Sequence, residues 1–179
     1  MQEIKQLNSK IVYQNKWMLV REDKIQRYSG AEGIYGVVEK TDFALIIPVQ
    51  KDQIYIVEQY RYPAGKRFWE LPQGSLESQE TFSMEEVAVI ELKEETGLVS
   101  KNMQYVGEQF VAYGYSTQKS HIFFATDLEQ GLNNLEDEEE GLISKRIPLA
   151  NFEKMIIDGT IQDAATINAY LLAKLKGFL

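Results

Sequence analysis

The chain has 179 residues, of which 44% are hydrophobic, and this suits one globular domain or one domain with a small appendage. It contains no cysteine and one histidine, which excludes disulfides, thiolate nucleophiles, zinc fingers, iron–sulfur clusters and multi-histidine metal sites within one chain. The net charge of −8 argues against nucleic acid as a partner, because phosphate contacts need a basic face. No run of residues is apolar enough to span a membrane or to serve as a secretory signal, so we expect a cytoplasmic protein without a membrane partner.

Residues 1–40 have the sequence pattern of a small β-sheet. The pattern predicts four short extended pieces at residues 11–13, 17–21, 24–28 and 33–39, with Glu22-Asp23 and Ser29-Gly30 as turns between them. A sheet of this size buries little by itself. We therefore expect residues 1–40 to form a β-strand subdomain that packs on the main domain, residues 41–179, or on a second subunit in a homodimer.

The first half of the main domain reads as a buried hairpin. Residues 43–49 (FALIIPV) are almost continuously apolar, which predicts a strand that is buried on both faces. Residues 54–60 alternate partly and predict its hairpin partner. Residues 61–67 form a basic loop, and residues 68–71 return to the sheet before a Pro-Gln-Gly turn.

The second half alternates strands with three helices. A capping box of Ser83 and Glu86 predicts a helix start, and Gly97 suits its end. Strands are expected at 103–112, 120–126 and 142–147, and helices at 150–158 and, capped by Asp163, at 164–176. This order predicts an α/β (α+β) fold with a mixed central sheet between helices.

Three carboxylates crowd the end of the first of these helices. Glu91 and Glu95 are i,i+4 neighbours, and Glu94 is three residues after Glu91. Acids are unfavourable at a helix C-terminus, where the macrodipole is negative, so a bound divalent cation would explain them; a plain solvated face is the alternative. Because thiolates are absent and histidine is nearly so, such a cation must be hard, such as Mg²⁺ or Mn²⁺.

The spacing of these acids resembles the Nudix box, G-x5-E-x7-R-E-aliphatic-x-E-E-x-G-aliphatic. Gly74 and Glu80 fit its first half, and residues 91–98 (ELKEETGL) fit its end. The chain departs from the pattern in two respects: two extra residues lie between these halves, and Ile90 stands where the pattern has an arginine that holds a metal-binding glutamate in place. The resemblance implies a Nudix α/β/α sandwich with a small N-terminal antiparallel sheet.

A second run points to one branch of that family. Residues 57–63 (VEQYRYP) and 68–72 (FWELP) are similar to the ADP-ribose pyrophosphatase, or nucleoside diphosphate sugar hydrolase, branch. The branch usually has Ser-Pro-Gly in a later loop, where this chain has Ala112-Tyr113-Gly114. The resemblance implies hydrolysis of the pyrophosphate bond of an ADP-ribose-like nucleotide sugar, with GDP-mannose or ADP-glucose as possible substrates.

The resemblance also assigns the metal site. It implies that Glu91 and Glu95 are metal ligands, with Glu94 in the outer shell or on a second ion, and that the Gln73 carbonyl adds a backbone ligand. A loop glutamate acts as general base or ligand in this branch. Here the acidic run of residues 136–140 supplies Glu139 and Glu140, of which Glu140 is favoured; a solvated loop is the alternative.

Candidate substrate contacts are basic or aromatic. Arg61 and Arg67 have the guanidinium geometry that clamps phosphate oxygens, although Arg67 also fits a surface charge. Trp17 or Tyr28 would stack on the base across a dimer, or belong to a core. Two further candidates for substrate contact are Glu70, which alternatively only pairs with these arginines as Glu58 does, and Tyr113.

Two rival functions remain open at this point. One is a Nudix hydrolase of nucleoside triphosphates or dinucleoside polyphosphates, for which Tyr113 is the supporting feature. The other is a Nudix domain that senses a ligand without cleaving it, for which Ile90 is the supporting feature.

Overall fold

The computed structural model describes residues 3–75, 82–131 and 140–179. The chain divides into two compact units. The N-terminal unit contains Met1–Asp42 and Phe110–Lys119, and the main unit contains Phe43–Gln109 and Ser120–Leu179. In the part of the chain that the structure describes, no helix is long and apolar enough to cross a membrane.

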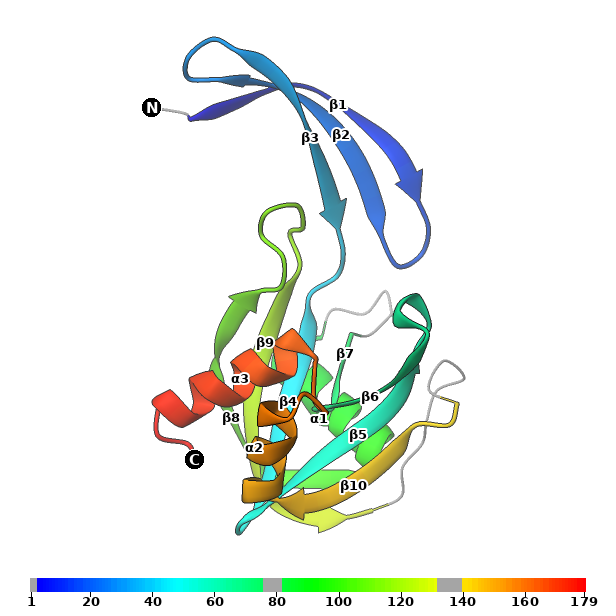
Figure 1. Ribbon diagram of the computed structural model, residues 1–179, viewed down its shortest axis with the longest axis vertical. Helices are drawn as coiled ribbons and strands as arrows, with labels where there is room; N and C mark the ends of the chain where they lie inside the picture. The colour runs from blue at the N-terminus through cyan, green and yellow to red at the C-terminus, as the bar shows by residue number, and fades with distance from the viewer. Residues whose placement is uncertain (1–2, 76–81, 132–139) are drawn as a thin grey trace. The chain divides into compact units, whose positions relative to one another are not determined.

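The N-terminal unit is built on a three-stranded antiparallel sheet in the order β1-β2-β3 (Figure 1). Its strands are β1 (Ile4–Gln14), β2 (Leu19–Arg27) and β3 (Glu32–Glu39). The expected turn at Glu22-Asp23 is wrong, because both residues lie within β2, where Arg21 pairs with Asp23. The chain turns earlier, where the side-chain oxygen of Asn15 accepts the backbone N–H groups of Trp17 and Met18, both at 2.9 Å.

The main unit contains a seven-stranded mixed sheet. Its strand order is β10-β5-β4-β9-β8, with β6 paired to β5 and β7 paired to β4. β4 runs parallel to β9 and antiparallel to β5 and β7, so the predicted mixed sheet is confirmed. The strands are β4 (Phe43–Gln50), β5 (Gln53–Arg61), β6 (Lys66–Glu70), β7 (Gln73–Gly74), β8 (Leu98–Phe110), β9 (Lys119–Gln130) and β10 (Ile143–Pro148), and a 3-10 turn, η1 (Tyr62–Ala64), joins β5 to β6.

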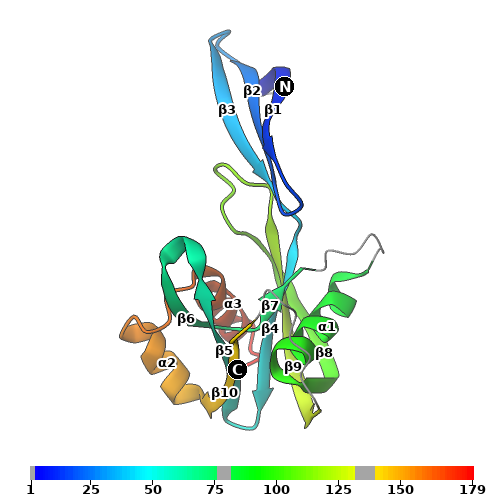
Figure 2. The ribbon, with the colours of Figure 1, turned by 90° about the vertical axis from the view of Figure 1, so that its right-hand side faces the viewer.

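Helices cover both faces of this sheet, as Figure 2 shows. α1 (Met84–Thr96) packs on one face, and α2 (Leu149–Ile157) and α3 (Ala164–Leu175) pack on the other. Alternate residues of β4 serve the two cores: Leu45 packs with the cluster of α2 and α3, and Ile46 packs with the cluster of α1. The predicted two-faced burial of this strand and the α/β/α sandwich are therefore confirmed.

The caps predicted for α1 are present. Ser83 Oγ accepts the Glu86 N–H at 3.2 Å, and the Glu86 carboxylate accepts the Ser83 N–H at 2.8 Å. Gly97 ends the helix with φ of +72°, a left-handed conformation that favours glycine. These two caps fix the ends of α1, so Glu91, Glu94 and Glu95 lie in its last two turns.

The predicted cap of α3 is also present, and α3 packs against α2. Asp163 Oδ2 accepts the Thr166 N–H at 2.8 Å. The Tyr170 ring lies 4.8 Å from that of Phe152, and the Tyr170 hydroxyl donates to Glu153 Oε1 at 2.8 Å. Burial and the neighbouring Glu153 carboxylate raise the pKa of Tyr170.

We expect Tyr170→Phe to lower the free energy of unfolding by about 1 kcal/mol near neutral pH, because it removes a hydrogen bond to a half-exposed charged group. The bonds from Lys174 and Tyr170 lower the pKa of Glu153 below its ordinary value of 4.5. The stabilisation is therefore complete above the pKa of the unfolded chain, and it is lost as the pH falls through the lowered pKa of the folded protein.

Urea denaturation of both proteins at neutral and acidic pH measures this difference, which should shrink in acid. Tyr62→Phe is the matched control, because it removes the hydroxyl of an exposed tyrosine. Equal losses of stability in the two variants would contradict the role of the Tyr170–Glu153 bond.

Candidate active site

Two glutamates of α1 are buried rather than solvated. Glu91 is 6% exposed and Glu95 is 1% exposed, whereas Glu94 is half-buried. Glu91 and Glu95 share the face of α1 that carries Val87 and Leu92 towards the sheet. A solvated acidic face is thereby excluded for these two residues, and burial of two carboxylates is costly unless their charge is compensated.

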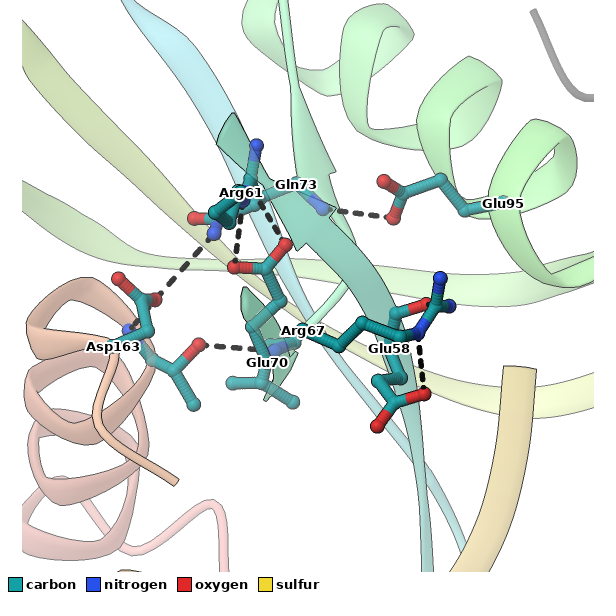
Figure 3. A network of polar contacts seen from close by, with 9 residues as sticks. Glu58, Arg61, Arg67, Glu70, Gln73, Glu95 and Asp163 are labelled. Atoms are coloured by element: carbon teal, nitrogen blue, oxygen red, sulfur yellow. Dashed lines mark hydrogen bonds and ion pairs between the residues drawn. The ribbon is translucent and has the colours of Figure 1, made fainter. Parts of the chain in front are cut away.

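The two-residue strand β7 meets both carboxylates. The Gln73 N–H donates to Glu95 Oε2 at 3.1 Å, and Figure 3 shows the Glu95 side chain pointing at Gln73. A Cβ on Gly74 would lie 2.3–2.6 Å from the carboxyl atoms of Glu91, closer than any real contact. Only glycine therefore fits at position 74 while Glu91 keeps this position.

An ion pair between the buried Glu70 and the partly exposed Arg61 lies next to this strand. Arg61 donates to both carboxylate oxygens of Glu70, from Nη2 at 2.5 Å and from Nε at 3.3 Å (Figure 3). Glu70 is 2% exposed, and its burial raises its pKa above the ordinary value of 4.5 while the Arg61 charge acts in the opposite direction. The predicted pairing of Glu70 with Arg61 is therefore confirmed, and the contact of Glu70 with substrate stays a prediction.

A hollow of about 280 Å³ opens beside the pair. Gln73 Nε2 donates to Asp163 Oδ2 at 3.4 Å across one wall. The other side-chain atom of Gln73, Oε1, is buried and has no hydrogen-bond partner among the residues that the structure describes. The hollow therefore offers one guanidinium and several acceptor oxygens, and it is lined by Arg61, Ala64, Phe68, Glu70, Gln73, Gln162 and Asp163.

Arg67 is engaged elsewhere. It donates to Glu58 Oε2 at 2.8 Å, to the Glu58 carbonyl at 2.9 Å and to the Gly141 carbonyl at 2.7 Å. The guanidinium thus holds the turn that contains Glu140, whose side chain is exposed. The expected Arg67–Glu58 pair is confirmed, and the phosphate contact of Arg67 stays a prediction.

The remaining predicted residues are distributed as follows. Trp17, Tyr28 and Tyr113 belong to the N-terminal unit and are exposed. Lys16 Nζ lies 4.2 Å from the centre of the Trp17 ring. Glu80 and Glu139 lie outside the described residues. The roles predicted for these five residues stay predictions.

Glu91 and Glu95 suit a hard cation that takes few of its ligands from the protein. Within residues 3–75, 82–131 and 140–179, no group of three or more His, Asp or Glu side chains gathers closely enough to hold a metal. Mg²⁺ is ordinarily held by one or two carboxylates together with water and substrate phosphates. Glu91 and Glu95, buried on one helix face and touching one strand, fit that demand.

Sequence reasoning missed the contribution of α3 to the site. Asp163 was expected only as a helix cap, yet it also contacts Gln73 and lines the hollow. Thr166, which is fully buried, accepts the Leu71 N–H at 2.9 Å. The available signals were the capping pattern of the last helix and the similarity of residues 158–164 to the ADP-ribose pyrophosphatase branch, and neither shows what Asp163 faces.

Comparison with known proteins agrees with this geometry. A family model described as the NUDIX domain matches residues 40–168, and one described as the nucleoside diphosphate sugar hydrolase N-terminal domain matches residues 4–38. An ADP-ribose pyrophosphatase of Mycobacterium tuberculosis is 27% identical over 168 residues, which cover 92% of this chain and 80% of the relative. The ADP compounds hydrolase NudE of Escherichia coli is 28% identical over 178 residues, which cover 96% and 92%.

A solved structure supports the fold. The crystal structure of an ADP compounds hydrolase matches with a TM-score of 0.84 and 24% identity, and covers 100% of this chain and 98% of that one. The NUDIX match includes both Gly74 and the acidic turn of α1, which the structure brings into contact. The chain therefore belongs to the Nudix hydrolase family.

Proposed function

We propose that this Nudix hydrolase cleaves the pyrophosphate bond of a nucleoside diphosphate sugar of the ADP-ribose type, giving a nucleoside monophosphate and a sugar phosphate. The observation that carries the proposal is the pair of buried glutamates on α1 that meet β7 next to the Arg61 guanidinium. The match to a nucleoside diphosphate sugar hydrolase N-terminal domain, and the relatives named ADP-ribose pyrophosphatase and ADP compounds hydrolase, support this substrate class.

A divalent cation, Mg²⁺ or in its place Mn²⁺, belongs to the proposal. Nudix hydrolases generally use divalent metals, and the residues that would hold one here are Glu91, Glu95 and the Gln73 carbonyl. Glu94 would act in the outer shell or on a second ion, and Glu140 would be a ligand supplied by the acidic run. When bound, such an ion polarises the phosphoryl oxygens and offsets the negative charge that develops on them.

The protein groups of the site are already oriented. The Gln73 N–H bond holds one oxygen of Glu95, and Gly74 leaves the space that the Glu91 carboxylate occupies. Glu70 accepts two bonds from Arg61, which holds the guanidinium at the hollow, where it can donate to phosphate oxygens. An oriented donor of this kind loses little entropy when the substrate binds.

The proton of the attacking water needs an acceptor. We assign the role of acceptor to a carboxylate of the acidic run, Glu140 or Glu139. Water oxygen forms a bond to one phosphorus as the bridging P–O bond breaks, the water proton passes to the carboxylate, and the bridging oxygen leaves with the departing phosphate. General base catalysis of this kind contributes typically ~10²–10⁴-fold.

A homodimer through the N-terminal sheet is part of the same proposal. Every residue of β1 is exposed, and its apolar side chains include Ile4, Leu7, Ile11 and Val12. Exposed apolar surface of this extent marks an interaction site. In such a dimer Trp17 or Tyr28 would stack on the substrate base, and Tyr113 would add a further contact.

A substrate panel tests the proposed reaction. We expect Mg²⁺-dependent release of AMP and ribose 5-phosphate from ADP-ribose, with GDP-mannose, ADP-glucose, UDP-glucose and ATP as competitors and Mn²⁺ as the alternative metal. Product identification by chromatography separates the classes. Release of phosphate or pyrophosphate from ATP in preference to cleavage of every nucleotide sugar would contradict the proposal.

The matched variants for this assay are Glu95→Gln and Glu85→Gln. Both replace a glutamate of α1 by its amide, but Glu85 is exposed in the first turn. We expect Glu95→Gln to lower kcat by at least ~10²-fold with the fold intact, and Glu85→Gln to behave as wild type.

Gly74→Ala tests the contact between β7 and Glu91. The added Cβ collides with the Glu91 carboxyl group, so the carboxylate must move. We expect a roughly 10²-fold loss of kcat, the scale caused by a displacement of about 1 Å in a catalytic group. Gly36→Ala is the control, because its Cβ meets no atom within 4 Å; equal activity of the two variants would refute the contact.

Light scattering tests the dimer. We expect wild type at twice the chain mass of 20.6 kDa, and Ile11→Lys shifted towards one chain mass because a charge is then placed on the apolar surface of β1. Ile157→Lys is the control, since Ile157 is exposed on α2 of the main unit. A wild-type protein that elutes as a single chain at micromolar concentration would refute the dimer.

A further inference from the structure

Residues 71–74, which we call the bridging segment, are bound on one side by the first turn of α3. The Leu71 N–H donates to Thr166 Oγ1 at 2.9 Å, and Gln73 Nε2 donates to Asp163 Oδ2 at 3.4 Å. Asp163 Oδ2 also accepts the Thr166 N–H at 2.8 Å, so the two acceptors are linked to each other. Figure 3 shows Gln73 between Asp163 and Glu95.

The opposite side of the bridging segment meets α1. The Gln73 N–H bonds to Glu95, and Gly74 touches the Glu91 carboxylate. α1 and α3 cover opposite faces of the sheet, so this segment joins the two helical layers. Thr166 and Glu95 thus act on backbone N–H groups only two residues apart.

The sheet itself holds this segment by few bonds. β7 has two residues, which pair with Ala44 and Leu45 of β4, and the Pro72 carbonyl accepts the Ile46 N–H at 2.9 Å. A two-residue strand makes a short ladder, so its position depends on the contacts of its flanks. The bond from Leu71 to the buried Thr166 hydroxyl is one such contact.

We propose that Thr166 is a positioning residue of the active site: through the bridging segment, its hydroxyl sets the position of β7 against Glu91 and Glu95. Thr166 is 0% exposed, so it does not touch substrate. A buried N–H that loses its acceptor is costly, and Leu71 would move to find another partner. The proposal rests on the metal-dependent reaction proposed above for the two glutamates.

The residue before Glu91 strengthens the argument. The Nudix pattern has an arginine there that holds a metal-binding glutamate, and this chain has Ile90, which cannot donate a hydrogen bond to a carboxylate. Constraint on the acidic turn must therefore come from other groups. The N–H of Gln73 and the close approach of Gly74 supply it. Asp163, the N-cap of α3, bonds the Gln73 side chain, and Thr166 bonds the Leu71 N–H at the start of the same segment.

Three variants of α3 separate positioning from simple stability. Thr166→Val keeps the shape of the side chain and removes the acceptor, whereas Thr166→Ser keeps the hydroxyl. Tyr170→Phe is the matched control, because it also removes a hydroxyl bond of α3 but faces Glu153 of α2. Thr166→Ala repeats the test without the valine methyl groups should Thr166→Val not fold.

Two measurements on the protein without substrate carry the test. In Thr166→Val we expect the Leu71 and Gln73 amides, followed by NMR, to exchange with solvent at least about tenfold faster than in wild type. We expect the dissociation constant for Mn²⁺ alone, measured by calorimetry, to rise about 10–100-fold, the scale for loss of a group that orients a metal ligand. Thr166→Ser should restore both values, and Tyr170→Phe should leave both unchanged.

Steady-state kinetics gives a third measurement on the same variants. With ADP-ribose, Thr166→Val should need more Mg²⁺ for half-maximal kcat while its KM at saturating Mg²⁺ stays near that of wild type. Wild-type exchange and Mn²⁺ affinity in Thr166→Val, or equal changes in Tyr170→Phe, would overturn the proposal. A wild-type protein that cleaves no nucleotide sugar would refute the proposed function instead, and amide exchange would still decide the role of Thr166.

Discussion

The structure of the site depends on the burial of two carboxylates against a strand of two residues. Glu91 and Glu95 lie on the sheet-facing side of α1, where the surrounding core excludes water. Ionised carboxylates at such positions require hydrogen bonds or opposite charge. β7 supplies an N–H from Gln73 and, at Gly74, a position without a side chain. Loss of either contact would alter the energy of a buried charge.

The Arg61–Glu70 pair extends the same principle to the hollow beside β7. Glu70 is buried and is expensive to ionise there, and the guanidinium offsets this cost. In return, Glu70 orients the Arg61 guanidinium, which lines the hollow. The site therefore has buried carboxylates on α1 and an oriented guanidinium at the end of β5, with Gln73 between them. This distribution of charge suits a diphosphate that is bound through both a cation and an arginine.

Much of the fold could be predicted from local patterns. The capping box at Ser83, the left-handed Gly97 and the cap at Asp163 are decided by residues within one helical turn, and all three are present. The continuous apolar run of β4 predicted burial on both faces because adjacent residues of a strand point to opposite faces of the sheet. The turn at Glu22-Asp23 failed because turn propensity ignores tertiary partners: Arg21, Asp23 and Glu39 form ion pairs that keep these residues in strands.

The sequence alone determined that any metal ligands are oxygens, that three glutamates crowd the end of one helix and that a glycine precedes them with two residues more than the spacing of the Nudix box. These are statements about composition and about neighbours along the chain. Only the tertiary structure decided that Glu91 and Glu95 are buried while Glu94 is half-exposed, that Arg67 holds the Gly141 turn, and that Thr166 reaches Leu71 across 95 positions. The reason is physical: side-chain burial and long-range hydrogen bonds arise when helices pack on a sheet, and no local pattern encodes which residues that packing brings together.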